Sequence, residues 1–304
     1  MSERTLTILG CGSAMPNRTH APSGQLLDYG QKQFLIDCGE GVQIALRRCT
    51  AHFAHLDNIF ISHLHGDHCF GLIGLISSFG MMDRTRDLHI YAQPHLETLL
   101  RPWLDYFCNE LPYSVLIHPI NPRRHQVIYT DRSLTVSTIP LKHKVPCCGF
   151  LFEDNPRQRH IRREMIEQYQ IPLAAIPAIK DGANFTTADG TVLSNDSLTL
   201  PPTPPFRYAY CSDTAYSERI VPIIRGVDCL FHEATYLSNM IERAKDTMHS
   251  TAQQAATIAK LAEVKRLIIG HYSARYNDPT PLLEEAQAVF PNTLAANEYQ
   301  TFEL

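Results

Sequence analysis

The stretch FISHLHGDHCFG, residues 60–71, places three histidines and an aspartate within six residues, directly after a hydrophobic run. A β-strand points successive side chains to opposite faces, so His63 and His65 would point the same way where the chain leaves a sheet. Imidazole and carboxylate groups are ligands that suit zinc, and two adjacent clusters of this kind can hold two ions. The stretch therefore predicts a metal centre at the end of a strand.

Two more candidate ligands, Asp67 and His68, follow in a tight turn that we expect at Gly66. One pocket can receive all four side chains. The alternatives are a chance cluster of surface histidines or a single structural zinc ion. Structural zinc sites prefer a closed shell rich in cysteine, which this motif does not supply, so a reactive metal centre is favoured.

Three further candidates each follow an apolar run, namely His143 after LTVST, Asp213 after YAYCS and His271 after RLIIG. Any one of them alone would more often be a surface residue or a hydrogen-bonded core residue. Three residues in the same position relative to a strand are harder to dismiss. A carboxylate has two oxygens, so Asp213 could bind two cations at once and reduce their repulsion.

Composition limits the class of protein. The chain has 304 residues, 44% of them hydrophobic, and a formal net charge of −4. That content fills a substantial core, and the charge gives no general nucleic-acid signature, so a polyanion would have to be held by a local patch or by metal. The longest apolar run, residues 69–82, is too short to span a bilayer.

The nine cysteines are scattered and odd in number, which fits reduced thiols better than a disulfide framework. We expect Cys38, Cys69, Cys211 and Cys229 to be small core residues. Together with the absence of an apolar signal core at the N-terminus, these features predict a soluble protein of the cytoplasm.

Strand-like and helix-like segments alternate along the chain. Both halves contain a β-rich stretch followed by β/α character, which predicts an α/β fold with two sheets packed face to face and helices outside. The expected strands lie at residues 5–10, 25–30, 33–37, 58–62, 88–92, 115–120, 126–130, 134–140, 207–213, 228–234 and 266–272, and the clearest helices at 42–49 and from about Pro94.

Residues 154–205 form a proline-rich segment that shows little of the alternation of apolar and polar residues typical of strands. It reads as an excursion from the domain, either an ordinary surface loop or a binding appendage. The basic run RQRHIRR, residues 157–163, favours binding. The early loop LGCGSAMPNRTHAPSG fails as a dinucleotide fingerprint, because Met15 stands where the third glycine belongs.

The motif SHLHGDH resembles that of the metallo-β-lactamase superfamily, and PLKHKVP, SDT, HEAT, MHSTA and HYSARY together resemble ribonuclease Z, the tRNA 3′-processing endonucleases. The resemblance covers essentially the whole chain. It implies one αβ/βα sandwich domain over residues 1–304 and homodimerisation. It also implies a protruding, flexible arm, the insert at 154–205, that grips the elbow of precursor tRNA.

The resemblance also implies two zinc ions per chain, with Asp213 shared between them. One ion would be bound by His63, His65 and His143, and the other by Asp67, His68 and His271, with Asp67 also accepting a proton.

His249 is the candidate proton donor, because it precedes the helix start STAQ and so stands near developing negative charge. We expect Ser250 and Gln253 to form a capping box there. Glu233 would hold the second ring nitrogen of His249 and favour its protonated form, the alternative being a simple surface salt bridge.

We therefore expect a zinc-dependent endoribonuclease that removes the 3′ trailer from precursor tRNA, leaving a 3′-hydroxyl on the tRNA and a 5′-phosphate on the trailer. One alternative is another hydrolase of the same fold, a phosphodiesterase or arylsulfatase acting on small esters, because a fold does not fix a substrate. The other is a zinc-binding or RNA-binding protein without activity, which a complete ligand set makes less favoured.

Overall fold

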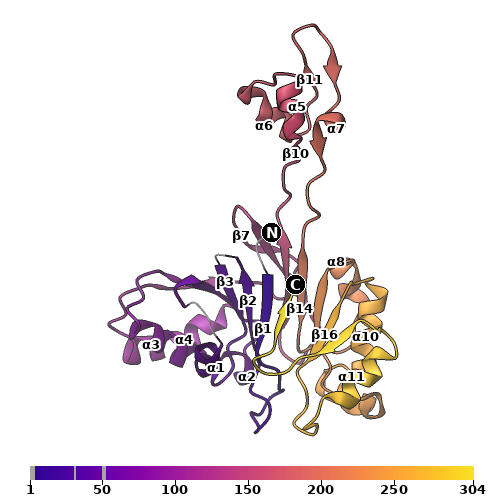
Figure 1. The fold of residues 1–304 in the computed structure, drawn as a ribbon. Helices are drawn as coiled ribbons and strands as arrows, with labels where there is room; N and C mark the ends of the chain where they lie inside the picture. Colours follow the sequence, from indigo (N-terminus) through magenta and orange to yellow (C-terminus); the bar gives the residue numbers. More distant parts are fainter. Residues whose placement is uncertain (1–3, 31, 50–52) are drawn as a thin grey trace. The chain divides into compact units, whose positions relative to one another are not determined.

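The computed structural model describes residues 4–30, 32–49 and 53–304. The chain divides into two compact units, each described separately below. The first unit consists of Met1–Thr130, Thr135–Phe152 and Arg207–Leu304, and the second of Asp131–Leu134 and Glu153–Phe206 (Figure 1). The second unit contains the segment 154–205 that the sequence sets apart.

The first unit contains two large sheets. One sheet has seven strands in the order β18-β1-β2-β3-β4-β5-β6. Its strands β1 to β3 and β18 are antiparallel neighbours, whereas β3 to β6 run parallel. The bounds are β1 Arg4–Gly10, β2 Gly24–Tyr29, β3 Lys32–Ile36, β4 Leu56–Phe60, β5 Leu88–Ala92, β6 Val115–Pro119 and β18 Thr301–Glu303.

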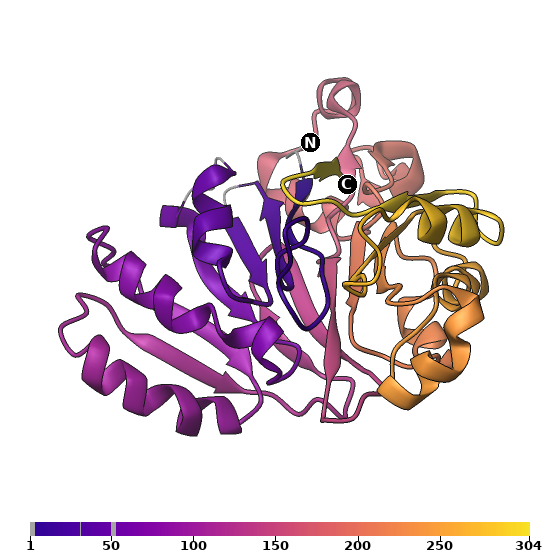
Figure 2. The same cartoon turned by 90° about the horizontal axis from the view of Figure 1, so that it is seen from below.

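Helices cover the outer face of this sheet (Figure 2). The apolar side chains of Leu46, Leu75 and Leu100, from three different helices, join the buried strand residues Leu35 and Ile59 in one core cluster. Burial of these side chains holds the helices on the sheet. The elements on this side are α1 Val42–Arg48, η1 Phe53–His55, α2 Gly66–Cys69, α3 Leu72–Gly80 and α4 His95–Phe107.

The other large sheet has the order β17-β16-β15-β14-β9-β8-β7. Its bounds are β7 Val127–Thr130, β8 Leu134–Pro140, β9 Cys148–Asp154, β14 Arg207–Cys211, β15 Cys229–Glu233, β16 Leu267–Gly270 and β17 Thr293–Ala295. Strands β14 to β17 are parallel, so their carboxyl ends meet at one edge. The neighbouring helical elements are η3 Glu218–Ile220, α8 Val221–Ile224, η4 Ser238–Met240, α9 Ile241–Thr247, α10 Ala252–Leu261 and α11 Thr280–Gln287.

The inner faces of the two sheets pack through aromatic side chains. The ring centroids of Phe34 and Phe152 lie 5.8 Å apart, and those of Phe60 and Phe150 lie 5.5 Å apart. Such tilted ring pairs are the favoured geometry for aromatic packing. With helices outside both sheets, this is the predicted αβ/βα sandwich, and the expected fold class is confirmed.

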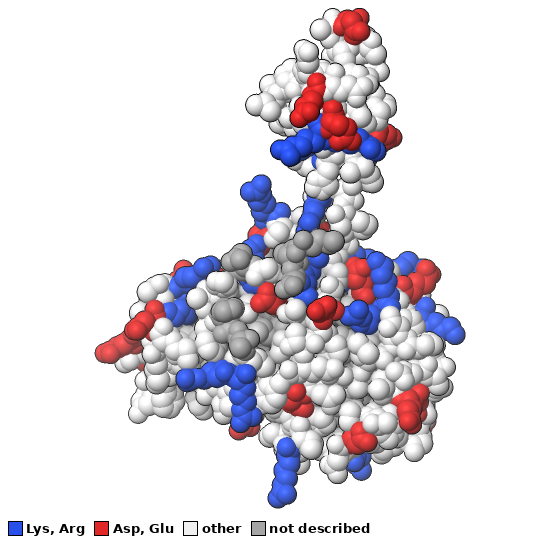
Figure 3. Space-filling model, viewed as in Figure 1, with Lys and Arg blue, Asp and Glu red and all other residues white. Residues whose placement is uncertain are grey.

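The second unit has its own small core of Ile171, Ile179 and Leu198. Arg159, from the basic run, forms an ion pair with Asp196, and Figure 3 shows acidic side chains beside the basic ones of this unit. Its elements are β10 His160–Ile161, α5 Arg163–Gln168, η2 Leu173–Ala175, α6 Ile176–Lys180, β11 Phe185–Thr186, β12 Val192–Leu193, α7 Asn195–Leu198 and β13 Thr199–Leu200.

Two local predictions were wrong. We expected a tight turn at Gly66, but Gly66 is the first residue of the helix α2. The capping box of α10 is formed by Thr251 and Gln254, one residue later than expected. The reason is that Ser250 is already engaged, since its hydroxyl donates to the carbonyl oxygen of Thr214 at 2.6 Å.

The cysteines are all free, and all nine lie in the described residues. Cys38, Cys211 and Cys229 are buried as expected, whereas Cys69 is only partly buried, since it lines an open apolar cavity. None of the helices in the described ranges has the length and apolar character needed to cross a membrane.

Candidate metal centre

Several side chains of the centre follow strand ends, where the backbone turns sharply. Asp37 follows β3, Asp213 follows β14 and His271 follows β16, with φ of 59°, 59° and 61°. Residues other than glycine rarely adopt this left-handed conformation, although aspartate and histidine are enriched in it. Strain of this kind is characteristic of functional sites. Here the left-handed conformation changes the direction of the chain after β3, β14 and β16, which belong to both large sheets of the first unit.

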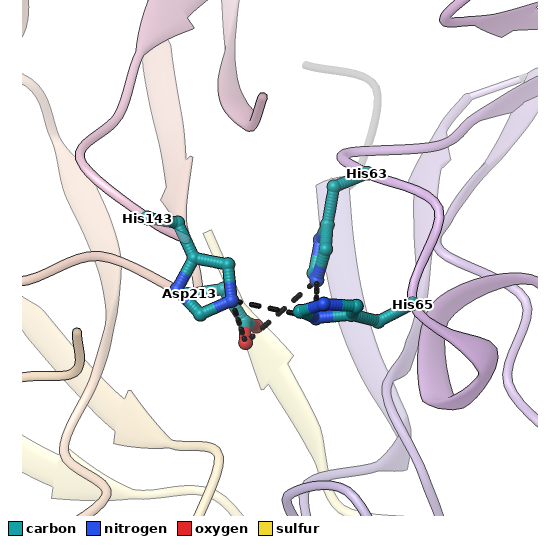
Figure 4. A group of neighbouring side chains, drawn as sticks. All are labelled: His63, His65, His143 and Asp213. Carbon is teal, nitrogen blue, oxygen red and sulfur yellow. Dashed lines mark hydrogen bonds and ion pairs between the residues drawn. The ribbon is translucent and has the colours of Figure 1, made fainter. Parts of the chain in front are cut away.

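One cluster contains His63, His65, His143 and one oxygen of Asp213. His63 Nε2 lies 2.9 Å from His65 Nδ1, and His143 Nε2 lies 3.4 Å from the same atom. Asp213 Oδ1 lies 3.9 Å from His63 Nε2 and 3.7 Å from His143 Nε2. Figure 4 shows these side chains converging from separate chain segments.

A second cluster contains Asp67, His68 and His271. The other oxygen of Asp213 faces this group, with Oδ2 at 3.0 Å from His68 Nε2 and 3.2 Å from His271 Nε2. Asp67 Oδ2 lies 3.4 Å from His68 Nε2. The two oxygens of Asp213 are therefore divided between two clusters, which is the arrangement expected of a carboxylate shared by two cations.

The residues fit a pair of metal ions by a further criterion. The Nε2 atoms of His68 and His271 are buried and have no hydrogen-bond partner among the described residues, although both are close to Asp213. Buried polar atoms are normally satisfied, so two such atoms aimed at the same carboxylate indicate a missing common partner. Burial, with the nearby His68, holds the pKa of His63 well below its usual value, which favours the neutral imidazole that binds metal.

The Nδ1 atoms of three of these histidines, which lie opposite the Nε2 atoms described above, contact neighbouring groups. Asp37 Oδ2 lies 2.7 Å from His68 Nδ1, and the hydroxyl of Thr235 lies 3.1 Å from His271 Nδ1. The carbonyl oxygen of Met248 accepts from His143 Nδ1 at 3.0 Å. Such contacts set the tautomer and the orientation of metal-binding histidines.

Asp37 is a buried residue of this centre that sequence reasoning missed. It also accepts hydrogen bonds from Ser62 N at 2.8 Å and from the Tyr210 hydroxyl at 2.6 Å. Its position gave a signal that could have found it, because it follows the strand QFLI just as Asp213 follows its own strand.

His249 and Glu233 lie beside the second cluster. His249 Nδ1 is 3.0 Å from Glu233 Oε1, and Glu233 is fully buried and also accepts from Ser250 N at 3.0 Å. Burial alone would lower the pKa of His249, but the charge of Glu233 and its hydrogen bond outweigh burial and raise that pKa to about 9. The pair is therefore no surface salt bridge, and this shift of the pKa favours the imidazolium form of His249.

The early loop also contributes to the centre. The backbone N–H of Ala14 donates to Asp67 Oδ2 at 2.8 Å. The loop is held in place by Glu298, which accepts from Ala21 N at 2.9 Å and lies 2.9 Å from His20 Nδ1. The early loop thus orients a candidate ligand, a role that the sequence did not predict.

All seven predicted ligands, together with His249 and Glu233, therefore lie around one centre in the first unit. Their roles as ligands and catalytic groups stay predictions, which are taken up below.

Comparison with known proteins identifies close relatives. The chain is 52% identical over 298 residues to the ribonuclease Z of Bacteroides fragilis, covering 98% of both chains. It is also 52% identical over 304 residues to the ribonuclease Z of Porphyromonas gingivalis, covering 100% of both chains. These matches confirm the resemblance drawn from the motifs.

Two further matches are more distant or shorter. The crystal structure of the short form of human tRNase Z has a TM-score of 0.71 at 23% identity, covering 98% of both chains, which confirms the fold. The family model described as anti-Pycsar protein Apyc1 matches residues 4–157. That range includes His63 to His68 but ends before Asp213, whereas the relatives above extend over both halves of the centre.

Proposed function

Because this chain belongs to the ribonuclease Z family, we propose that it is a metal-dependent endoribonuclease that cuts the 3′ trailer from precursor tRNA. The observation that carries the proposal is the 52% identity to ribonuclease Z proteins over the full length of both chains. Similarity of this extent covers the metal centre and the second unit together. A hydrolase of small esters would need the centre but would have no use for the arm.

We assign two zinc ions to the centre, one bound by His63, His65 and His143 and the other by Asp67, His68 and His271. Asp213 serves both. The donor set of imidazole and carboxylate groups suits zinc, and the divided oxygens of Asp213 support the shared role. When bound, such a metal pair lowers the pKa of a water molecule and neutralises charge on a phosphate.

The chain's own residues move the protons. Asp67 accepts a proton from the attacking water, and the N–H of Ala14 at 2.8 Å holds its carboxylate in place. His249 donates a proton to the departing 3′ oxygen of the tRNA. Its Nδ1 is engaged by Glu233, so Nε2 delivers the proton. The products are a 3′-hydroxyl on the tRNA and a 5′-phosphate on the trailer.

We propose that the second unit is a tRNA-binding arm. It exposes apolar side chains, with Leu173 at 81% and Val192 at 64% exposure. A cavity of about 640 Å³ lies between α5 and the β11–β12 hairpin, lined by Tyr169 and Phe185 among others. Exposed apolar groups and an open hollow are features of a binding surface.

We further propose a homodimer formed through an apolar face on α2, α3 and α4. Leu99, Trp103, Tyr106 and Phe107 of α4 are all more than half exposed, as is Phe70. This face includes a cavity of about 430 Å³ lined by apolar side chains. Tryptophan and tyrosine are enriched at the centres of protein interfaces, which supports burial of this face by a second copy. We place the enzyme in the cytoplasm, as its free thiols and its RNA substrate suggest.

The test is a comparison of substrates by the purified protein. We expect cleavage of a precursor tRNA with kcat/KM far above that for bis(p-nitrophenyl) phosphate or an aryl sulfate, and loss of both activities on chelation. A higher kcat/KM for a small ester than for precursor tRNA would instead favour the small-ester hydrolase.

A further inference from the structure

A third hollow opens beside the metal centre. It has a volume of about 730 Å³ and is lined by residues 140–147 together with Arg123, Tyr216 and Arg219. His143, one of the proposed ligands, forms part of its wall. We call this hollow the basic pocket. Whatever it holds lies next to the reacting atoms.

Four cations line the basic pocket, namely Arg123, Lys142, Lys144 and Arg219, and all are exposed. None of their side chains forms an ion pair or hydrogen bond with another described residue, and the described lining residues include no carboxylate. Unpaired cations gathered in one hollow are unusual in a chain of net charge −4. They create a local attraction for an anion.

The pocket also contains an aromatic ring. Tyr216 is half-buried in its wall, and its hydroxyl donates to Glu218 at 2.7 Å, which helps to fix the ring. Aromatic rings among cations are the arrangement with which proteins bind single-stranded nucleic acids, since bases stack on the ring and phosphates contact the cations.

The loop of residues 140–147 is connected to the segment after Asp213 by backbone hydrogen bonds. Lys142 N donates to the hydroxyl of Thr214 at 3.2 Å, and Ala215 N donates to the carbonyl oxygen of Lys142 at 2.8 Å. Thr214 and Ala215 directly follow Asp213. A phosphate held by this loop would therefore keep a fixed position relative to the shared carboxylate.

We propose that the basic pocket binds the single-stranded nucleotides next to the scissile phosphate of the RNA substrate. This inference rests on the proposed function, and it adds specificity-determining contacts from Arg123, Arg219 and Tyr216 to those of the arm. An acidic peptide is the other anion that could enter, but RNA is favoured because the pocket shares a wall with the centre that would cleave it.

The test measures binding of a short single-stranded RNA to the zinc-loaded protein by fluorescence anisotropy at several salt concentrations. In the double variant Arg123→Ala/Arg219→Ala we expect the dissociation constant to rise roughly tenfold or more at low salt. The salt dependence should also become shallower by roughly 0.7 for each lost phosphate contact. Replacement of both residues by lysine keeps the charges and should restore most of the affinity.

The control is Lys260→Ala, which removes an exposed and equally unpaired cation on α10, outside the pocket. If the double variant binds RNA as tightly and with the same salt dependence as Lys260→Ala, the proposal is wrong. It is also wrong if the double variant keeps RNA affinity but loses affinity for an acidic peptide. Because this assay needs no cleavage, failure of the proposed endonuclease activity would appear separately.

Tyr216 allows a second comparison. Tyr216→Phe keeps the ring and loses only the hydroxyl contact with Glu218, whereas Tyr216→Ala removes the stacking surface. We expect affinity for single-stranded RNA to fall roughly tenfold in Tyr216→Ala and little in Tyr216→Phe. Equal affinities of the two variants would exclude base stacking on this ring.

Discussion

At the scale of single residues, the proposed two-metal centre depends on Asp213, whose two oxygens face different clusters. Its Oδ2 lies 3.0 Å from His68 Nε2, whereas its Oδ1 lies 3.7 Å from His143 Nε2. Its left-handed backbone conformation is one that asparagine also tolerates, so Asp213→Asn changes the charge with little change in backbone strain.

We therefore predict that Asp213→Asn loses metal from both clusters, whereas His143→Ala loses mainly one ion because it contacts one cluster. Zinc content per chain, measured by elemental analysis after dialysis, checks this. The wild-type protein should hold two ions. Equal zinc content in the two variants would contradict a shared role for Asp213.

A variant of His249 can distinguish proton donation from metal binding. We predict that His249→Ala keeps its zinc and binds precursor tRNA, but cleaves it roughly 10² to 10⁴ times more slowly, the range for a lost general acid. A p-nitrophenyl ester should lose less, because its leaving group needs no proton. Loss of zinc from this variant would instead make His249 a ligand, which its place near Asp213 and His271 allows.

The proposed role of His249 also predicts how kcat depends on pH. The pKa of His249 is raised to about 9 by Glu233 against the opposing effect of burial, so the acid is present at neutral pH and is lost as the pH rises. Bound cations act against Glu233, so the decline in kcat should begin below about pH 9. Glu233→Gln should move this decline to lower pH. An unchanged pH profile of kcat in this variant would contradict the proposed pairing.

The sequence predicted which side chains gather at the centre, because imidazole and carboxylate groups that follow apolar runs stand out from their surroundings. It did not predict Asp37, whose role depends on the packing of Ser62, His68 and Tyr210 around it. Nor did it predict Ala14, which contributes only a backbone N–H to Asp67, since any residue type provides that group.

At the scale of elements, we expect that the second unit can be deleted without disrupting the fold of the first unit. Asp154 N donates to the carbonyl oxygen of Phe206 at 2.9 Å, so the two ends of the insert lie side by side. A short glycine-rich turn can therefore replace residues 155–205. We predict a much higher KM for precursor tRNA and nearly unchanged hydrolysis of bis(p-nitrophenyl) phosphate, because the arm provides contacts and no chemistry. Equal losses on both substrates would make the segment structural.

Element boundaries show where local patterns fail. The motif STAQ predicted a cap at Ser250, but Ser250 is drawn into the centre by Thr214 and Glu233, which leaves Thr251 as the cap. The strands were easier to predict than the helix ends, because an apolar run such as RLIIG is typical of a buried parallel strand. The pairing order of the sheets depends on contacts distant in sequence, so it was not predicted, and the family resemblance implied only the αβ/βα sandwich.

At the scale of the whole molecule, the apolar face on α4 predicts self-association. Trp103→Arg places a charge at the centre of that face, where Trp103 is 54% exposed, and should shift the dimer to monomers without unfolding them. Sedimentation velocity checks the mass. Arg101→Ala, on the same helix but paired with Glu97, is the matched control and should stay dimeric. A wild-type protein that is monomeric at micromolar concentration would contradict the homodimer.

The most direct measurement of the account is cleavage of a precursor tRNA with a 3′ trailer by the zinc-loaded protein, with both new RNA ends mapped and Asp213→Asn assayed beside it. We predict one cut that leaves a 3′-hydroxyl on the tRNA and a 5′-phosphate on the trailer, and no cut by the variant. An intact precursor with the wild-type protein, or equal cleavage by Asp213→Asn, would contradict it.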